Sequence, residues 1–292
     1  MPTPYTTLIS AAELLQLSGA LIADCSHDLA DPQAGQRDYA AAHIPGALFL
    51  HLDRDLSAPM TGRNGRHPLP DAQAFADRLA QLGLKQNQQV IAYDRAGGGF
   101  AVRLWWMLRW LGHDAVAVLD GGWQAWVAAG GASEGVAPAP RAPGNFIRHP
   151  SLVGDVPAQG VLDNLRSAHK LVLDARAPER YAGEVEPIDP VAGHIPGAKN
   201  RFFQTNLQPD GTFKSREQLR EEFTALLEDW DPRDVIHHCG SGVSGCHNLL
   251  AMTHAGLDGS LLYPGSWSEW CADPAHPVAT GRAPGKQGDA NT

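Results

Sequence analysis

The sequence carries one pattern twice, and this internal repeat limits how the chain can fold more than any other feature does. The motif "HIPGA" occupies residues 43–47 and returns as residues 194–198. Three further pairs keep the same order and nearly the same spacing: "LIAD" with "LVLD", "VIAYD" with "VIHHC", and "GGWQAW" with "GSWSEW". We therefore predict two copies of one fold.

Within each copy, short β-rich runs alternate with helical patterns. The run "VIAYD", for example, is followed by "FAVRLWWMLRWLGH", which has apolar residues at helical spacing. Such alternation predicts an α/β fold in which each domain is a mostly parallel sheet flanked by helices. The Pro-, Gly- and Ala-rich stretch 131–160 has no helical periodicity and indicates a connector. We place the first domain at 1–135, the linker at 136–155 and the second domain at 156–292.

Composition and charge exclude several classes of function. The 292 residues suffice for two domains of about 150 residues each. A net charge of −9 without a block of Lys and Arg argues against a nucleic-acid partner. Neither a signal peptide nor an apolar run long enough to span a bilayer is evident, so we expect a cytoplasmic protein without a membrane partner. The four cysteines are too few for a disulfide framework in a chain of this length, and we expect free thiols.

Cys239 stands where the apolar run "VIHH" meets a loop of small residues. The loop residues Gly240, Ser241, Gly242 and Val243 carry little side-chain bulk, so their backbone N–H groups can turn inward and bind an anion. A helix that begins just after the loop adds the positive end of its dipole. Both effects favour the thiolate, which is the nucleophilic form of cysteine. The alternative is a buried cysteine that only fills space.

The first copy provides an internal control for this reading. Its matching position is Asp94, followed by "RAGGG". A carboxylate cannot supply a thiolate nucleophile, so we expect chemistry in the second copy only.

From "LIADCS" to "GSWSEW", nearly the whole chain resembles the rhodanese-type sulfurtransferases with two domains, in which the first domain is inactive. The loop "CGSGV" is similar to that of family members that use 3-mercaptopyruvate. Thiosulfate-using members usually carry two basic residues in this loop, and here there are none. The resemblance implies a ping-pong reaction in which Cys239 takes sulfur from 3-mercaptopyruvate as a persulfide, and the loop residues through Ser244 surround that sulfur.

The same resemblance implies roles for other residues. Ser241 would relay a proton with His67 of "HPLP" and Asp53 of "HLD"; otherwise His67 is a surface residue and Asp53 a turn former. Arg180, with Arg176 nearby, would bind the carboxylate of the donor. Family members often have a second arginine where this chain has Ile188.

Two alternatives remain open at this point, and two others are disfavoured. Thiosulfate is the alternative donor, and a persulfide carrier without turnover is the non-catalytic alternative. A phosphatase of this fold needs arginine at position 245, which is glycine. The histidines beside Cys239 suggest zinc, but adjacent strand residues point in opposite directions, so we expect no metal and no cofactor. The acceptor is expected to be a thiol, such as thioredoxin or glutathione, or cyanide.

Overall fold

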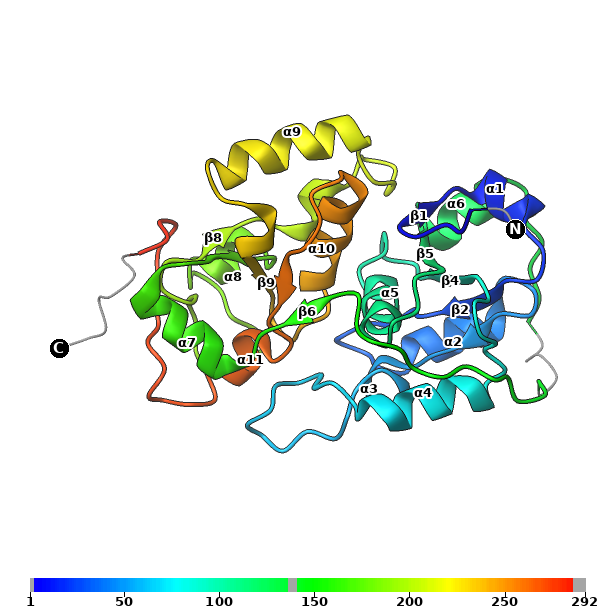
Figure 1. Cartoon of the computed structure of the whole chain (residues 1–292), viewed down its shortest axis with the longest axis horizontal. Coiled ribbons are helices and arrows are strands. Elements are labelled where there is room, and N and C mark those ends of the chain that lie inside the picture. Colours follow the sequence, from blue (N-terminus) through cyan, green and yellow to red (C-terminus); the bar gives the residue numbers. More distant parts are fainter. Residues whose placement is uncertain (1–2, 136–140, 286–292) are drawn as a thin grey trace. The chain divides into compact units, whose positions relative to one another are not determined.

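Two five-stranded sheets organise the part of the chain that the structure, a computed structural model, describes, namely residues 3–135 and 141–285 (Figure 1). Every paired strand runs parallel to its neighbours. The strand orders are β1-β5-β4-β2-β3 and β6-β10-β9-β7-β8, so the two sheets have the same topology. The predicted α/β fold with two like domains is confirmed.

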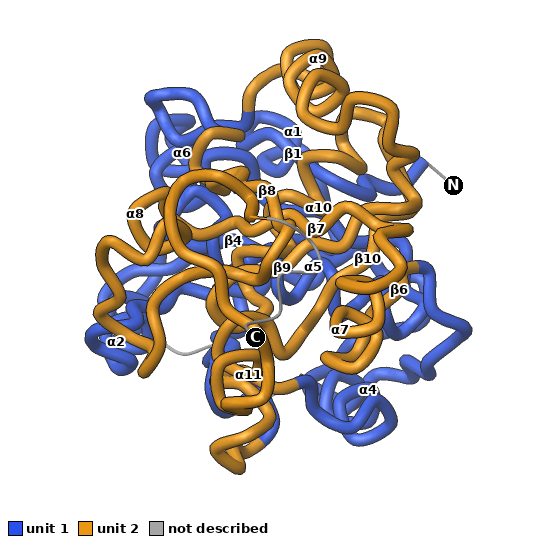
Figure 2. Tube along the Cα trace, turned by 90° about the vertical axis from the view of Figure 1, so that its left-hand side faces the viewer, with its two compact units in different colours: residues 1–58, 69–152, 207–213 blue, residues 59–68, 153–206, 214–292 orange. Residues whose placement is uncertain are grey.

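Two compact units contain these sheets. Unit 1 comprises residues 1–58, 69–152 and 207–213, and unit 2 comprises residues 59–68, 153–206 and 214–292 (Figure 2). The short segment 59–68 therefore packs with unit 2 although it lies within the first half of the sequence. This segment contains His67.

Unit 1 contains five strands and the helices that flank them. The elements are β1 (Leu8–Ile9), α1 (Ala11–Gln16), β2 (Leu21–Asp24), α2 (Ala34–Ala41), β3 (Leu48–Phe49), α3 (Leu52–Asp55), α4 (Ala72–Gln81), β4 (Val90–Tyr93), α5 (Ala101–Trp110), β5 (Val116–Leu119) and α6 (Gly122–Ala128).

Unit 2 repeats this order. Its elements are β6 (Gly154–Asp155), α7 (Ala158–Ser167), β7 (Leu171–Asp174), α8 (Pro178–Tyr181), β8 (Lys199–Asn200), the 3-10 helix η1 (Phe203–Asn206), α9 (Arg216–Leu227), the 3-10 helix η2 (Pro232–Asp234), β9 (Val235–His238), α10 (Gly245–His254), β10 (Leu261–Leu262) and α11 (Ser266–Trp270).

The central strands β4 and β9 are buried along their whole length, as expected for strands of a parallel sheet covered by helices. In β9 the burial includes His237, whose pKa is lowered to about 3, chiefly because burial disfavours its charged form. Both sheets keep the same register at this point, since Asp24 pairs with Tyr93 and Asp174 with His238. The residues that follow the central strands, Asp94 and Cys239, thus occupy equivalent positions.

The repeated "HIPGA" motif has a structural role in both units. In unit 1 the ring of Tyr39 stacks on His43 at 3.9 Å, and its hydroxyl donates to the carbonyl of Ala47 at 2.7 Å. In unit 2 Tyr181 stacks on His194 in the same way and donates to the carbonyl of Ala198 at 2.6 Å. The motif fixes the chain ahead of the edge strand in each sheet.

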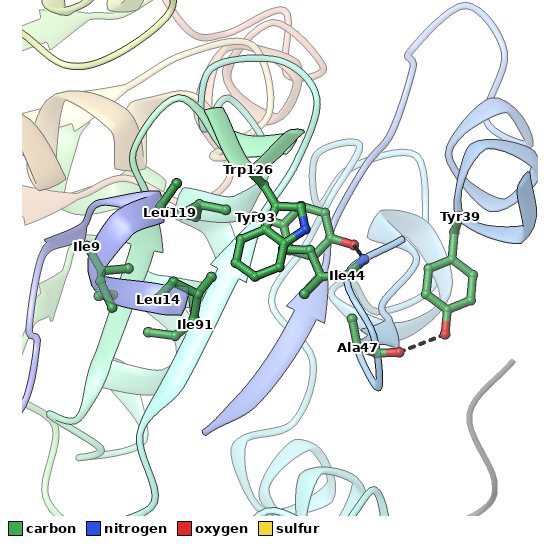
Figure 3. Close-up of a cluster of buried hydrophobic side chains, with 11 residues drawn as sticks. Ile9, Leu14, Tyr39, Ile44, Ala47, Ile91, Tyr93, Leu119 and Trp126 are labelled. Carbon is green, nitrogen blue, oxygen red and sulfur yellow. Dashed lines mark hydrogen bonds between the residues drawn. The ribbon is translucent and has the colours of Figure 1, made fainter. Parts of the chain in front are cut away.

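The core of unit 1 gathers around β4 and β5. Figure 3 shows Ile9, Leu14, Ile91 and Leu119 packed together, with Trp126 beside them. The Tyr93 hydroxyl accepts a hydrogen bond from the backbone N–H of Ile44 at 3.1 Å, which ties the "HIPGA" turn to the central strand. An equivalent cluster of unit 2 includes Ile195, Tyr263 and Trp267.

The predicted linker 136–155 is partly described. Residues 136–140 lie outside the described residues, and residues 141–152 belong to unit 1. The N–H of Gly144 donates to the carbonyl of Ala80, and that of His149 donates to Leu111. In the described ranges, no helix combines the length and apolar character that a membrane span requires.

Candidate active site

Cys239 is the first residue after the central strand β9, and α10 begins six residues later. Its side chain is buried, with 2% of the residue exposed. The loop turns at Gly242, whose φ of +76° suits glycine, and a Cβ there would lie 2.1 Å from the carbonyl oxygen of Pro264. Glycine is therefore the residue this turn requires.

Hydrogen bonds from the loop converge on the sulfur of Cys239. Burial raises the thiol pKa, but hydrogen bonds from the Ser244 side chain and from the backbone of Ser241, Gly245 and Val243 outweigh burial, and the pKa lies below its ordinary value. The Ser241 N–H donates to Sγ at 3.4 Å. The loop thus stabilises the thiolate.

The backbone of Cys239 is held by residues at the start of α11. Its N–H donates to the hydroxyl of Ser266 at 3.1 Å, and its carbonyl accepts from the N–H of Trp267 at 3.0 Å. Ser266 in turn donates to the carbonyl of Tyr263 at 2.9 Å. Ser266 has φ of +56°, a left-handed conformation that is costly for a residue with a Cβ. Ser266 was not predicted from the sequence; its position within the second of the "GGWQAW"/"GSWSEW" pair was the available signal.

The first unit fills the same loop with a carboxylate. Asp94 accepts backbone hydrogen bonds from four residues at 2.8–2.9 Å, two on each oxygen: Ala96, Gly98, Phe100 and Ala101. The anion-binding loop predicted for the second copy is thus present in the first, where a fixed negative side chain occupies it.

Ser241 and His67 are brought together within unit 2. Ser241 Oγ lies 2.7 Å from His67 Nδ1, a hydrogen-bonding distance, and 5% of each residue is exposed. The same serine contacts Cys239 through its N–H. One residue therefore links the sulfur to an imidazole that can exchange a proton.

Asp53, the third predicted member of this relay, belongs to unit 1. It lies in α3 with its side chain 42% exposed, and its N–H donates to His51 Nδ1 at 3.1 Å. In the described ranges, one group of three or more His, Cys, Asp or Glu residues has its possible metal-ligand atoms all within 4.8 Å of one another. It consists of His27, His51 and Asp53. The histidines beside Cys239 form no such group there.

The two predicted arginines have different surroundings. Arg176 is 3% exposed, forms a buried ion pair with Asp174 at 2.7 Å and lies 4.7 Å from the ring of Trp267. Burial alone would raise the pKa of the Asp174 carboxyl. The charge of Arg176 outweighs this effect, and the pKa of Asp174 is lowered to about 2. Arg180 is more accessible, and its guanidinium lies 3.6–3.7 Å from the Cβ position of Gly240.

Arg66 completes a pair with Arg180 and was not predicted from the sequence. A Cβ at Gly240 would lie 2.8 Å from Arg66 Nη2, so both guanidinium groups lie against the residue that follows Cys239. The position of Arg66 beside His67 in "GRHPLP" was the available signal. Two acidic residues contact these arginines: Asp189 is ion-paired with both, and Glu186 binds Arg180 at 2.7 Å.

A protein-family comparison matches two segments of the chain, residues 10–129 and 158–273, to the rhodanese-like domain. Among curated proteins, a probable 3-mercaptopyruvate sulfurtransferase of Pseudomonas aeruginosa is 49% identical over 89% of this chain and 92% of its own length. A putative thiosulfate sulfurtransferase of Mycobacterium tuberculosis is 37% identical over 94% of this chain and 98% of its own.

Similar solved structures include two proteins of the same class. The 3-mercaptopyruvate sulfurtransferase from Leishmania major superposes with a TM-score of 0.82 at 30% identity, over 92% of this chain and 75% of that one. A 3-mercaptopyruvate sulfurtransferase from Escherichia coli superposes with a TM-score of 0.75 at 29% identity, over 90% of this chain and 99% of that one.

Proposed function

The chain belongs to the rhodanese-like family and is an enzyme of the sulfurtransferase class, and we propose that it takes sulfur from 3-mercaptopyruvate through a persulfide on Cys239. The relatives that carry this activity in their names cover most of the chain. The observation that carries the proposal is the geometry of Ser241, which contacts Cys239 through its N–H and His67 through its hydroxyl.

The first half-reaction forms the persulfide. The Cys239 thiolate attacks the sulfur of 3-mercaptopyruvate, an S–S bond forms and the C–S bond breaks. The electron pair of the broken bond passes to the carbon, which leaves as the enolate of pyruvate and takes up a proton to give pyruvate. The loop N–H groups that stabilise the thiolate are placed to solvate the terminal sulfur as well.

Ser241 and His67 act on the proton in this half-reaction. Protonation of the leaving enolate needs an acid near the sulfur, and the 2.7 Å contact allows His67 to pass a proton through the Ser241 hydroxyl. Asp53 remains the proposed third member of the relay, the role that the family resemblance implies for it.

The donor carboxylate is assigned to Arg180 and Arg66. Both guanidiniums lie against Gly240, one residue from the nucleophile, and a planar guanidinium suits a carboxylate. Arg176 was the second arginine expected from the sequence. Its burial and its ion pair with Asp174 favour a structural role instead, because donor binding would have to break that pair.

The second half-reaction needs an acceptor. A thiolate attacks the outer sulfur of the persulfide, takes it as a new S–S bond and releases the Cys239 thiolate; cyanide takes the sulfur as thiocyanate. We propose a thiol acceptor, such as glutathione or thioredoxin, in a reducing cytoplasm, where the thiols of buried cysteines such as Cys25, Cys239 and Cys271 would persist.

Steady-state kinetics tests this function. kcat/KM is measured for 3-mercaptopyruvate and for thiosulfate on the same purified protein, with cyanide as acceptor. We expect a large preference for 3-mercaptopyruvate and loss of both activities in Cys239→Ser. A preference for thiosulfate, the donor named for the Mycobacterium tuberculosis relative, would contradict the donor assignment. A stable persulfide without turnover would indicate a carrier module.

A further inference from the structure

The connection between α8 and the "HIPGA" motif is longer in unit 2 than its counterpart in unit 1. Tyr39 and His43, which stack on one another, are four residues apart, whereas the equivalent Tyr181 and His194 are thirteen apart. The second repeat therefore carries nine additional residues. They include Glu186 and Asp189, the acidic residues that contact the arginine pair.

Asp189 bridges the two guanidiniums. One carboxylate oxygen binds Arg66 Nη1, and the other binds Arg180 Nη2 at 3.1 Å. The Asp189 side chain is 2% exposed, while Arg66 and Arg180 keep 22% and 17% exposure. The carboxylate thus lies on the buried side of the pair, and the arginines keep an accessible side.

Glu186 supports this arrangement. Its carboxylate accepts from Arg180 Nε and Nη2, and its Oε1 also accepts from the N–H of Asp189 at 3.1 Å. Glu186 also pairs with Arg176, at 3.4 Å. Among the described residues, three carboxylates, those of Asp174, Glu186 and Asp189, therefore face the three guanidiniums of Arg66, Arg176 and Arg180, and the arginines are neutralised before any donor arrives.

We propose that Asp189 is a specificity-determining residue that disfavours dianionic sulfur donors. This inference rests on the proposed function, because it concerns the choice of donor at that same site. A donor with one carboxylate and a thiol can share the accessible N–H groups of Arg66 and Arg180 while Asp189 stays in place. Thiosulfate carries two negative charges and meets the repulsion of Asp189 without a spare positive charge to offset it.

The test compares both donors in Asp189→Asn, which removes the charge and keeps the shape of the side chain. We expect kcat/KM for thiosulfate to rise about tenfold relative to kcat/KM for 3-mercaptopyruvate, because one like-charge contact in a partly exposed site is of that order. The matched control is Glu184→Gln, which also removes one negative charge from the connection between α8 and the "HIPGA" motif. Glu184 is 48% exposed and pairs with Arg282, so the donor ratio should not change.

An unchanged or lowered thiosulfate-to-mercaptopyruvate ratio in a folded Asp189→Asn protein would overturn the inference and leave the proposed function intact. Absence of turnover with 3-mercaptopyruvate in the unaltered protein would overturn both. If Asp189→Asn fails to fold, the inference is tested by inhibition of the unaltered enzyme with a singly charged anion, pyruvate, and a doubly charged one, sulfate. We expect pyruvate to inhibit more strongly than sulfate, and the reverse order would refute the role of Asp189.

Discussion

Asp94 in unit 1 and Cys239 in unit 2 occupy the same position of the repeat, and the backbone carbonyl of each accepts a hydrogen bond from the backbone N–H of a tryptophan. Trp123 donates to Asp94 at 2.9 Å, and Trp267 donates to Cys239 at 3.0 Å. The loop after each residue directs backbone N–H groups toward its side chain. The repeat therefore supplies one anion-binding loop twice, once around a carboxylate and once around a nucleophile.

Asp94 should contribute to the stability of unit 1. In Asp94→Asn an amide group replaces one oxygen and faces two N–H donors, so buried donors lose their acceptor, at a cost of about 3 kcal/mol or more. Urea unfolding should show this loss. The control is Asp28→Asn, because Asp28 also accepts a backbone hydrogen bond, from Ala30 at 2.7 Å, but is exposed. Equal effects of the two changes would contradict the structural role of Asp94.

The pH dependence of alkylation should show the stabilised thiolate. Because the pKa of Cys239 lies below its ordinary value, the thiolate persists to lower pH, and its reaction with iodoacetamide should reach half its maximal rate below the value of about 8.5 typical of free cysteine. Cys271, whose pKa burial raises, serves as internal comparison. A midpoint for Cys239 at or above 8.5 would argue against the loop hydrogen bonds.

The contact between Ser241 and His67 should matter for one donor more than for the other. His67→Ala and Ser241→Ala should lower kcat for 3-mercaptopyruvate about 100-fold, the lower end of general acid–base effects, because the enolate loses its proton source. Persulfide formation from thiosulfate, which releases sulfite and needs no such proton, should fall much less. His169→Ala, at an exposed histidine of unit 2, is the control. Equal losses with both donors would exclude the relay.

Ser266 should position Cys239, and two variants separate its hydroxyl from its backbone. Ser266→Gly removes the hydroxyl that accepts from the Cys239 N–H and relieves the left-handed conformation; Ser266→Ala removes the hydroxyl only. Both should lower kcat several-fold with KM unchanged, and the glycine variant should be about 1 kcal/mol more stable than the alanine variant. Normal kcat in both would show that the hydroxyl does not position the nucleophile.

Much of this architecture follows from the sequence because the repeat and the alternation of strands and helices are local patterns. The position of Cys239 at the end of a strand and its loop of small residues could be read in this way. The contact of His67 with Ser241 was inferred from a family resemblance, and the structure shows it within unit 2.

Residues joined by long-range packing could not be found in the same way. Arg66 contacts Asp189 only because segment 59–68 packs with unit 2, which the order of the chain does not reveal. Arg176 resembled a substrate-binding residue, but its ion pair with Asp174 depends on burial that no local pattern indicates. Ser266 contacts Cys239 across 27 residues of sequence.

Formation of a persulfide on Cys239 is tested by the mass of the protein after a single turnover without acceptor. The protein is mixed with 3-mercaptopyruvate, and the pyruvate released and the intact mass are measured together. We expect one pyruvate per chain and one added sulfur atom, which peptide mapping places on Cys239 and which cyanide removes. Pyruvate release without added sulfur, or sulfur on another cysteine, would contradict it.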